Sequence, residues 1–96
     1  MYEYKAKVID IFLSNGIQLE LDIDLGFNIH IIKTIKMYAV DTIFNKQQEC
    51  IARLGQLIPI GTEVKVSTLK KDLGIIYLNN LNIRVQLIQE RLATTV

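Results

Sequence analysis

An Asp-Thr pair, Asp41-Thr42, follows an Ile-rich segment and is the first candidate for chemistry in this chain. At the end of a strand, such a pair offers a carboxylate and a carbonyl, which are oxygen ligands that suit a hard cation. The same residues also form simple turns, because their side-chain oxygens accept hydrogen bonds from nearby backbone N–H groups. A metal site and a turn are therefore both open interpretations of this pair.

Three acidic residues share one side of a predicted strand, because Glu20, Asp22 and Asp24 are spaced two apart. Alternate side chains of a strand point to the same face, so these carboxylates have a spacing that suits a shared cation. A row of carboxylates is also typical of a face that points to solvent, and we favour that interpretation. His30 can titrate near neutral pH, but a lone histidine more often has a structural role.

The chain has one Cys and one His, which excludes an internal disulfide and argues against a zinc site of the Cys/His type. We expect Cys50 to be a small, partly buried residue on a helix. Five lysines form either a basic rim or a set of dispersed charges: Lys33, Lys36, Lys65, Lys70 and Lys71. Aromatic residues are not interleaved with them, and the formal net charge is only +1. Both observations argue against a strong nucleic-acid binder.

Length and composition predict one globular domain, residues 1–96, because half of the residues are hydrophobic and 22% are charged. The N-terminal residues contain no apolar run, so no signal peptide is expected. No run of about 18 apolar residues is present, so no membrane span is expected. The predicted location is cytoplasmic.

Alternation of apolar and polar residues predicts strands at residues 2–11, 17–23 and 29–40. The second strand has the clearest alternation, with Ile or Leu at every odd position. Asn15-Gly16 predicts a tight hairpin between the first two strands, because both residues tolerate a positive φ. A turn at residues 25–28 leads into the third strand, so the three strands form a meander.

Two helices are predicted by apolar residues that recur three or four positions apart. The first covers residues 45–57, with Asn45 as N-cap, and Pro59 ends it because the residue before a proline avoids the α region. The second covers residues 82–92, with Asn82 as N-cap. The predicted apolar stripes are Ile51, Leu54 and Ile58 in the first helix, and Val85, Ile88 and Leu92 in the second.

Two further strands are predicted at residues 63–69 and 74–78, joined by a charged turn at residues 70–72. Val64 and Val66 are expected to point inward. The complete order is β-β-β-α-β-β-α. Five strands with a helix between the third and fourth predict a β-barrel with helices (an α+β fold) of the five-stranded OB type.

Six segments carry a family resemblance: YKAKVID at residues 4–10, DIDLGF at 22–27, VDT at 40–42, IPIGTEV at 58–64, GIIYL at 74–78 and LIQERLA at 87–93. Taken together and in this order, they resemble the staphylococcal nuclease (thermonuclease, SNase-like) family, especially its short phage and bacterial members. The resemblance covers almost the whole chain. It implies an SNase-like OB-fold and, for intact members, phosphodiester hydrolysis with one calcium ion.

The calcium ligands that the resemblance implies are only partly present. The family has an acidic metal ligand in the first hairpin, and Asn15 stands at that place. The family's metal-binding Asp and Thr at the strand end match Asp41 and Thr42. Calcium takes roughly six to eight oxygen ligands, so loss of one carboxylate is expected to weaken its binding. Asp10 or Asp22 would have to supply the missing ligand if activity survives.

The catalytic positions that the resemblance implies are also changed. Lys36 stands where the family has an Arg that holds the scissile phosphate, and Leu73 stands in place of a second Arg. Lysine replaces a guanidinium only as a point charge. Phe44 stands in place of the general-base Glu, and loss of such a base typically removes about 10²–10⁴-fold in rate. Phe44 either seals the former pocket or presents an apolar contact to a partner.

The sequence therefore predicts a catalytically inactive SNase-like OB-fold (a pseudo-nuclease) that acts as a binding module. A protein partner is favoured because the net charge is nearly neutral, and for a phage protein that partner would be a host factor. The alternative is a weak calcium-dependent nuclease or a nucleic-acid binder that does not cleave. No cofactor is expected unless calcium-dependent cleavage survives. The exposed edges of a partly open barrel allow pairing of strands between molecules, but the oligomeric state is not readable.

Overall fold

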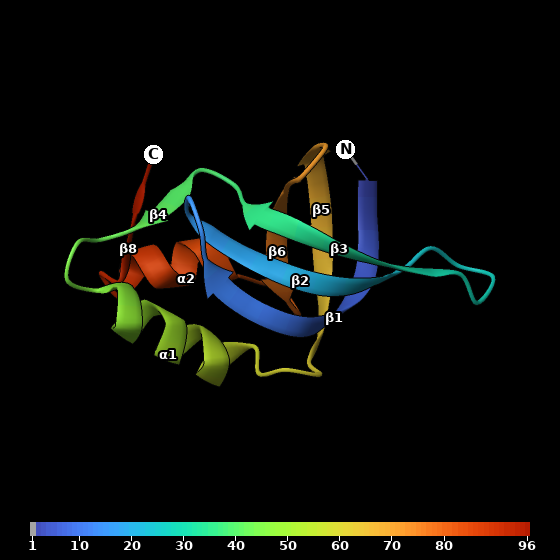
Figure 1. Cartoon of the computed structure of the whole chain (residues 1–96), viewed down its shortest axis with the longest axis horizontal. Helices are drawn as coiled ribbons and strands as arrows, with labels where there is room; N and C mark the ends of the chain where they lie inside the picture. Colours follow the sequence, from blue (N-terminus) through green and yellow to red (C-terminus); the bar gives the residue numbers. More distant parts are fainter. Residues whose placement is uncertain (1) are drawn as a thin grey trace.

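The computed structural model describes residues 2–96, which form a barrel flanked by two helices (Figure 1). Strands β1 (Tyr2–Leu13), β2 (Ile17–Asp24) and β3 (His30–Met37) make an antiparallel meander. Asn15-Gly16 turns the chain between β1 and β2 with both φ angles positive, as predicted. The odd positions of β2 are buried and the even positions are half-buried, which confirms the predicted alternation.

The sheet continues through β5 (Glu63–Lys70), β6 (Leu73–Leu78) and the short β7 (Leu81–Asn82), in the order β3-β2-β1-β5-β6-β7. A parallel pairing of β3 with β6 closes it. Strands β1, β2, β3, β5 and β6 therefore form a closed, mixed, five-stranded barrel, and the predicted OB-like α+β class is confirmed. Val64 and Val66 point into the core, also as predicted.

Helix α1 (Gln47–Leu57) lies beside β1 and ends before Pro59, as predicted. Its N-cap is Lys46, which makes no side-chain capping bond, so the prediction of Asn45 as N-cap is wrong. Asn45 instead has a φ of 73° and turns the chain before the helix. Cys50 is fully buried rather than partly buried, because it shares the inward face of α1 with Leu54.

Helix α2 (Ile83–Gln89) begins as predicted, because the Asn82 side chain accepts a hydrogen bond from the Val85 N–H at 3.4 Å. It is shorter than expected, since Arg91 has a φ of 60° and breaks the helix. The predicted stripe is also wrong in part. Ile83 and Leu87 are fully buried, whereas Val85 is exposed, because the helix turns a different face to the barrel.

The predicted third strand is divided in two. Ala39 has a φ of 53°, which ends β3 and starts the short strand β4 (Val40–Thr42). Strand β4 pairs with a C-terminal strand that we did not expect, β8 (Ala93–Thr95). These two strands form a separate small sheet beside the barrel.

The β2–β3 hairpin projects from the barrel at one end of the long axis, whereas α1 and the β4–β8 sheet lie toward the other end (Figure 1). The principal extents are 43 × 25 × 24 Å, so the projection accounts for the elongated shape. Among residues 2–96, none of the helices is long and apolar enough to cross a membrane.

Candidate functional site

A pocket of about 230 Å³ lies where β3, β4 and β6 meet the first hairpin. It contains three of the predicted site residues, Lys36, Asp41 and Leu73. The complete lining is Gly16, Lys36, Met37, Tyr38, Ala39, Val40, Asp41, Leu73 and Val96. The positions predicted from sequence therefore come together in part, at the end of β3 where the barrel closes.

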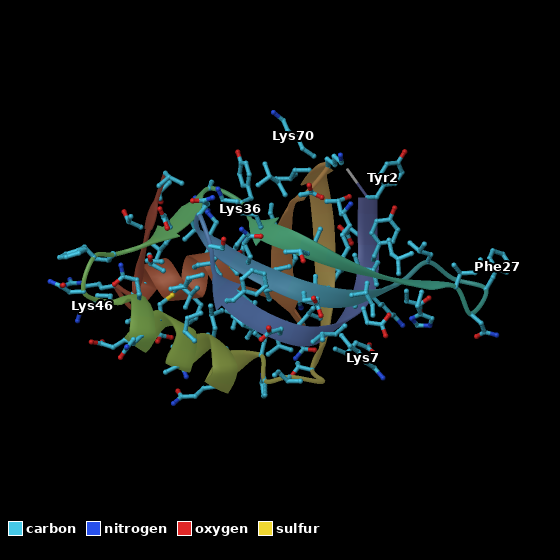
Figure 2. The ribbon with its side chains drawn as sticks, viewed as in Figure 1. Tyr2, Lys7, Phe27, Lys36, Lys46 and Lys70 are labelled. Carbon is cyan, nitrogen blue, oxygen red and sulfur yellow. The ribbon has the colours of Figure 1, made fainter. Side chains whose placement is uncertain are left out.

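The barrel closure positions Lys36 and Leu73 directly. They are partners in the parallel pairing of β3 with β6, and the Lys36 backbone N–H donates to the Asp72 carbonyl at 2.7 Å. The Lys36 side chain lies over Gly16, so a Cβ at Gly16 would be 2.8 Å from Lys36 Cε. Gly16 also has a φ of 109°, which favours glycine. The hairpin thus leaves room for this lysine, which Figure 2 labels.

Asp41 has a local hydrogen-bond partner. Its Oδ1 accepts a hydrogen bond from the Thr42 N–H at 2.7 Å, and the side chain is otherwise exposed. Thr42 is half-buried and pairs with Ala93 of β8, and it does not line the pocket. Asp41 lies inside strand β4 and pairs with Thr94 of β8, so the interpretation of Asp41-Thr42 as a turn is wrong. Its carboxylate bonds to the next backbone N–H of the same strand.

Asn15 and Phe44 do not line the pocket. Asn15 is exposed and has a φ of 53° at the tip of the first hairpin, where its conformation serves the turn. Phe44 is 81% exposed in the loop after β4. The interpretation that Phe44 seals the former pocket is therefore wrong, because its ring lies in solvent.

The carboxylates suggested as replacement ligands lie elsewhere. Asp10 Oδ1 accepts a hydrogen bond from the Ile11 N–H at 2.8 Å and borders a different pocket. Asp22 Oδ1 lies 3.2 Å from His30 Nδ1. Asp22 is four residues along β2 from Gln18, the partner of Lys36, which corresponds to about 13 Å. Among residues 2–96, no three His, Cys, Asp or Glu residues are grouped so that they could hold a metal ion.

Two of the acidic residues of β2 stand opposite lysines of β1, whereas Glu20 stands opposite Asp10. Lys5 is the cross-strand partner of Asp24 on β1, and Lys7 is the partner of Asp22. Asp24 Oδ1 also accepts a hydrogen bond from the Gly26 N–H at 2.8 Å. These contacts agree with our interpretation of the row as a polar surface.

Carboxylates within the chain pair with two of the five lysines. Lys33 Nζ lies 3.2 Å from a carboxylate oxygen of Asp72, and Lys65 Nζ lies 3.3 Å from one of Glu3. Lys65 also lies over the ring of Tyr77, 5.4 Å from its centroid. Two of the five charges are therefore balanced within the chain, which supports the dispersed interpretation.

Two long-range contacts, one of them at the pocket, were not predicted. Arg84 Nε on α2 donates to the Ala39 carbonyl at 3.1 Å, and Ala39 is part of the pocket wall. Arg53 on α1 forms a two-pronged ion pair with Glu90, at 2.7 and 3.1 Å. This hydrogen bonding lowers the pKa of Glu90 and raises the pKa of Arg53. Both contacts join residues far apart in the sequence, so no local pattern signals them.

The buried thiol of Cys50 is not in a reactive form. Burial raises the pKa of its thiol to about 11, since the thiolate would lose its hydration. The neutral thiol is a poor nucleophile. Cys50 is therefore a packing residue of α1.

Comparison of the chain with protein-family models and with curated proteins finds no match.

Proposed function

We propose that this chain is a non-catalytic binding module on a nuclease-like OB barrel, and that its pocket holds a segment of a partner protein. The observation that carries the proposal is the composition of the pocket wall. One cation, Lys36, and one anion, Asp41, stand among apolar groups that include Tyr38, Leu73 and Val96. Ligand pockets of this kind combine a mostly apolar surface with a few polar groups that set orientation.

Loss of catalysis is supported by the number of acidic groups. Within residues 2–96, Asp41 supplies the only side-chain carboxylate on the pocket wall, and it already accepts a hydrogen bond from the Thr42 N–H. A metal-dependent phosphodiesterase needs oxygen ligands for the cation and a base within reach of the attacking water. The matching position for that base holds Phe44, whose ring is in solvent.

A protein partner is supported over a nucleic acid by the charges around the pocket. Nucleic-acid affinity grows with the number of phosphates that Lys and Arg neutralise. The pocket wall supplies one lysine beside one aspartate, and Lys33 nearby on β3 is paired with Asp72. A peptide needs only a few contacts of either sign. The resemblance to phage members further suggests that the partner is a host factor.

The test is affinity capture from cells of the native source, with wild type and Lys36→Glu compared in parallel. We expect Lys36→Glu to lose the protein that wild type retains. Lys71→Glu is the matched control, because Lys71 is an exposed lysine of the β5–β6 turn that does not line the pocket. Equal retention by wild type and both variants would place the partner on another surface and overturn the assignment of this pocket.

The alternative is a weak calcium-dependent nuclease, or a nucleic-acid binder without cleavage, and the neighbouring Asp41 and Thr42 are the observation in its favour. A nuclease assay with calcium and with chelator separates the two functions. We expect no cleavage in either condition. Calcium-dependent cleavage that disappears in Asp41→Ala would refute the non-catalytic proposal. Salt-dependent DNA binding without cleavage would favour a nucleic-acid partner.

A further inference from the structure

The N-terminal half of β3 is an open sheet edge. One side of β3 pairs with β2 along its whole length, but the other side pairs with β6 only at Lys36 and Met37. The Lys36 N–H points to that second side, because it donates to the Asp72 carbonyl. Backbone groups of alternate residues point the same way, so those of His30, Ile32 and Thr34 also face outward. No strand within residues 2–96 pairs with them.

Exposed apolar side chains line this edge and the tip of its hairpin. Ile32 is 68% exposed and Phe27 is 98% exposed, and Figure 2 shows Phe27 at the far end of the projection. Leu25, Ile29 and Ile31 are also exposed. Ile31 and Ile32 are adjacent in β3, so the exposed apolar side chains lie on both faces of the sheet.

We propose that this edge pairs with the same edge of a second copy of the chain. The two β3 strands run antiparallel about a two-fold axis at Ile32, so Ile32 faces Ile32 of the second copy. His30 then faces Thr34 of the second copy, and Thr34 faces His30. Each of these pairs exchanges two backbone hydrogen bonds, and the dimer contains one continuous sheet across the two barrels.

The limits of the open edge determine the register. At one end, Asn28 has a φ of 62° and turns the chain away. At the other end, the Lys36 N–H already donates to the Asp72 carbonyl. Ile32 lies midway along the outward-facing residues between these limits. This register places Lys33 opposite Ile31 of the second copy, whereas centring the pair on Lys33 would bring two like charges together.

Self-pairing also fits the amount of surface available. A stable dimer buries about 800 Å² on each partner. The exposed apolar side chains beside Ile32 supply part of that area on the two faces of the sheet, and the backbone of β3 and the polar side chains beside it supply further contact. A second copy is the occupant that brings an equal apolar edge to the same place, and this inference is independent of the proposed pocket function.

The first test is the mass of the protein in solution, by light scattering on a sizing column over a range of concentrations. We expect a species of twice the 11.0 kDa chain mass. Ile32→Lys places two positive charges opposite each other and is expected to raise the dissociation constant on the order of 100-fold. Ile60→Lys is the matched control, because Ile60 is 70% exposed in the loop before β5. It should stay dimeric.

The second test uses the two-fold axis itself. Ile32→Lys and Ile32→Glu are each expected to be monomers, and an equimolar mixture of the two should restore the dimer, since opposite charges then meet. Ile32→Cys should form a covalent dimer on oxidation, because residues that face each other in a hydrogen-bonded pair have Cα atoms about 5.5 Å apart. Ile60→Cys should not, and the native Cys50 is buried in both variants.

A wild-type protein that stays monomeric at hundreds of micromolar would overturn the proposal. So would an Ile32→Lys variant that dimerises as strongly as wild type. Ile32 is exposed in the single chain, so circular dichroism should be unchanged in these variants. Thermal unfolding should also be unchanged at protein concentrations low enough for wild type to be monomeric, because the dimer itself adds stability at higher concentrations. Loss of the dimer is then separable from loss of the fold.

Discussion

The two ends of strand β3 differ in whether the outward-facing backbone groups have hydrogen-bond partners. At the C-terminal end, the Lys36 N–H is bonded to Asp72, Leu73 pairs beside it, and the α2 residue Arg84 bonds to the Ala39 carbonyl. At the N-terminal end, the outward groups of Ile32 have no strand partner within residues 2–96, and the side chain is in solvent. One strand therefore carries a closed end and an open end.

This difference indicates that the two ends of one sheet edge have different roles. The closed end is held by hydrogen bonds from several elements, which gives the pocket side chains defined positions. The open end keeps its backbone bonding capacity for another strand. Substitutions at the closed end should therefore change stability, whereas substitutions at the open end should change association.

The largest effect is expected when an isoleucine of β3 is truncated to alanine, and the same change can be compared at the closed end and at the open end. Ile35 is fully buried at the closed end, so Ile35→Ala should lower the free energy of unfolding by about 2–5 kcal/mol in urea denaturation. Ile31 points to the same face of β3 but is 43% exposed, so Ile31→Ala should cost clearly less. Equal losses would show that the hairpin is packed as firmly as the barrel and would remove the distinction.

A smaller effect is expected at the closure of β3 with β6. A Cβ at Gly74 would lie 3.0 Å from methyl groups of Ile35 and Val66, and 3.2 Å from the Ser67 carbonyl oxygen. Gly74→Ala should therefore destabilise the fold by about 1–3 kcal/mol through overpacking. Thermal unfolding measures the change. A Gly74→Ala variant as stable as wild type would mean that the closure is loose and resembles the open end.

The next smaller effect is expected for two aspartates whose carboxylates each accept a hydrogen bond from a nearby backbone N–H. Asp41→Ala at the closed end and Asp24→Ala at the hairpin each remove one acceptor of a backbone N–H, at 2.7 and 2.8 Å. Each should cost about 0.5–1.5 kcal/mol. Chemical denaturation of the two variants gives the comparison. If Asp41→Ala instead stabilises the protein, the carboxylate is retained for a function at the pocket and not for its contact with the Thr42 N–H.

The smallest effect concerns the ion pair that joins α1 and α2. The pKa of Glu90 is lowered mainly by its hydrogen bond with Arg53, so the folded state favours the charged carboxylate. The stability that Glu90 contributes is fully present above its ordinary pKa and is lost as the pH falls through the lowered value. Wild type should therefore be more stable than Glu90→Gln at neutral pH, and the difference should shrink in acid. A difference that stays constant from neutral to acidic pH would contradict this linkage.

Local patterns predicted most of the barrel. The alternation in β2, the Asn15-Gly16 turn and the Asn82 cap depend on neighbouring residues, and all three are confirmed. The β4–β8 sheet was missed because its strands are short and about 50 residues apart, and no local signal encodes such a pairing. The break of β3 at Ala39 was missed for a related reason, since the Arg84 contact at that turn comes from α2.

The candidate site was predicted in part. Lys36, Asp41 and Leu73 do line one pocket, whereas Thr42, Phe44 and Asn15 do not. The sequence placed Phe44 near a corner but contained no information on where its ring would point. Side-chain direction after a short strand depends on how that strand pairs, and β4 pairs with the C-terminal end of the chain.

The sequence alone determined the order of the five barrel strands and the two helices, and the buried face of β2, because period-two alternation and turn residues act over a few positions. Tertiary structure decided where the barrel closes, and that closure separates the two ends of β3. The closure pairs Lys36 with Leu73 and leaves Ile32 open. The physical reason is that pairing between distant strands depends on the geometry of the whole barrel, which no local run of residues specifies.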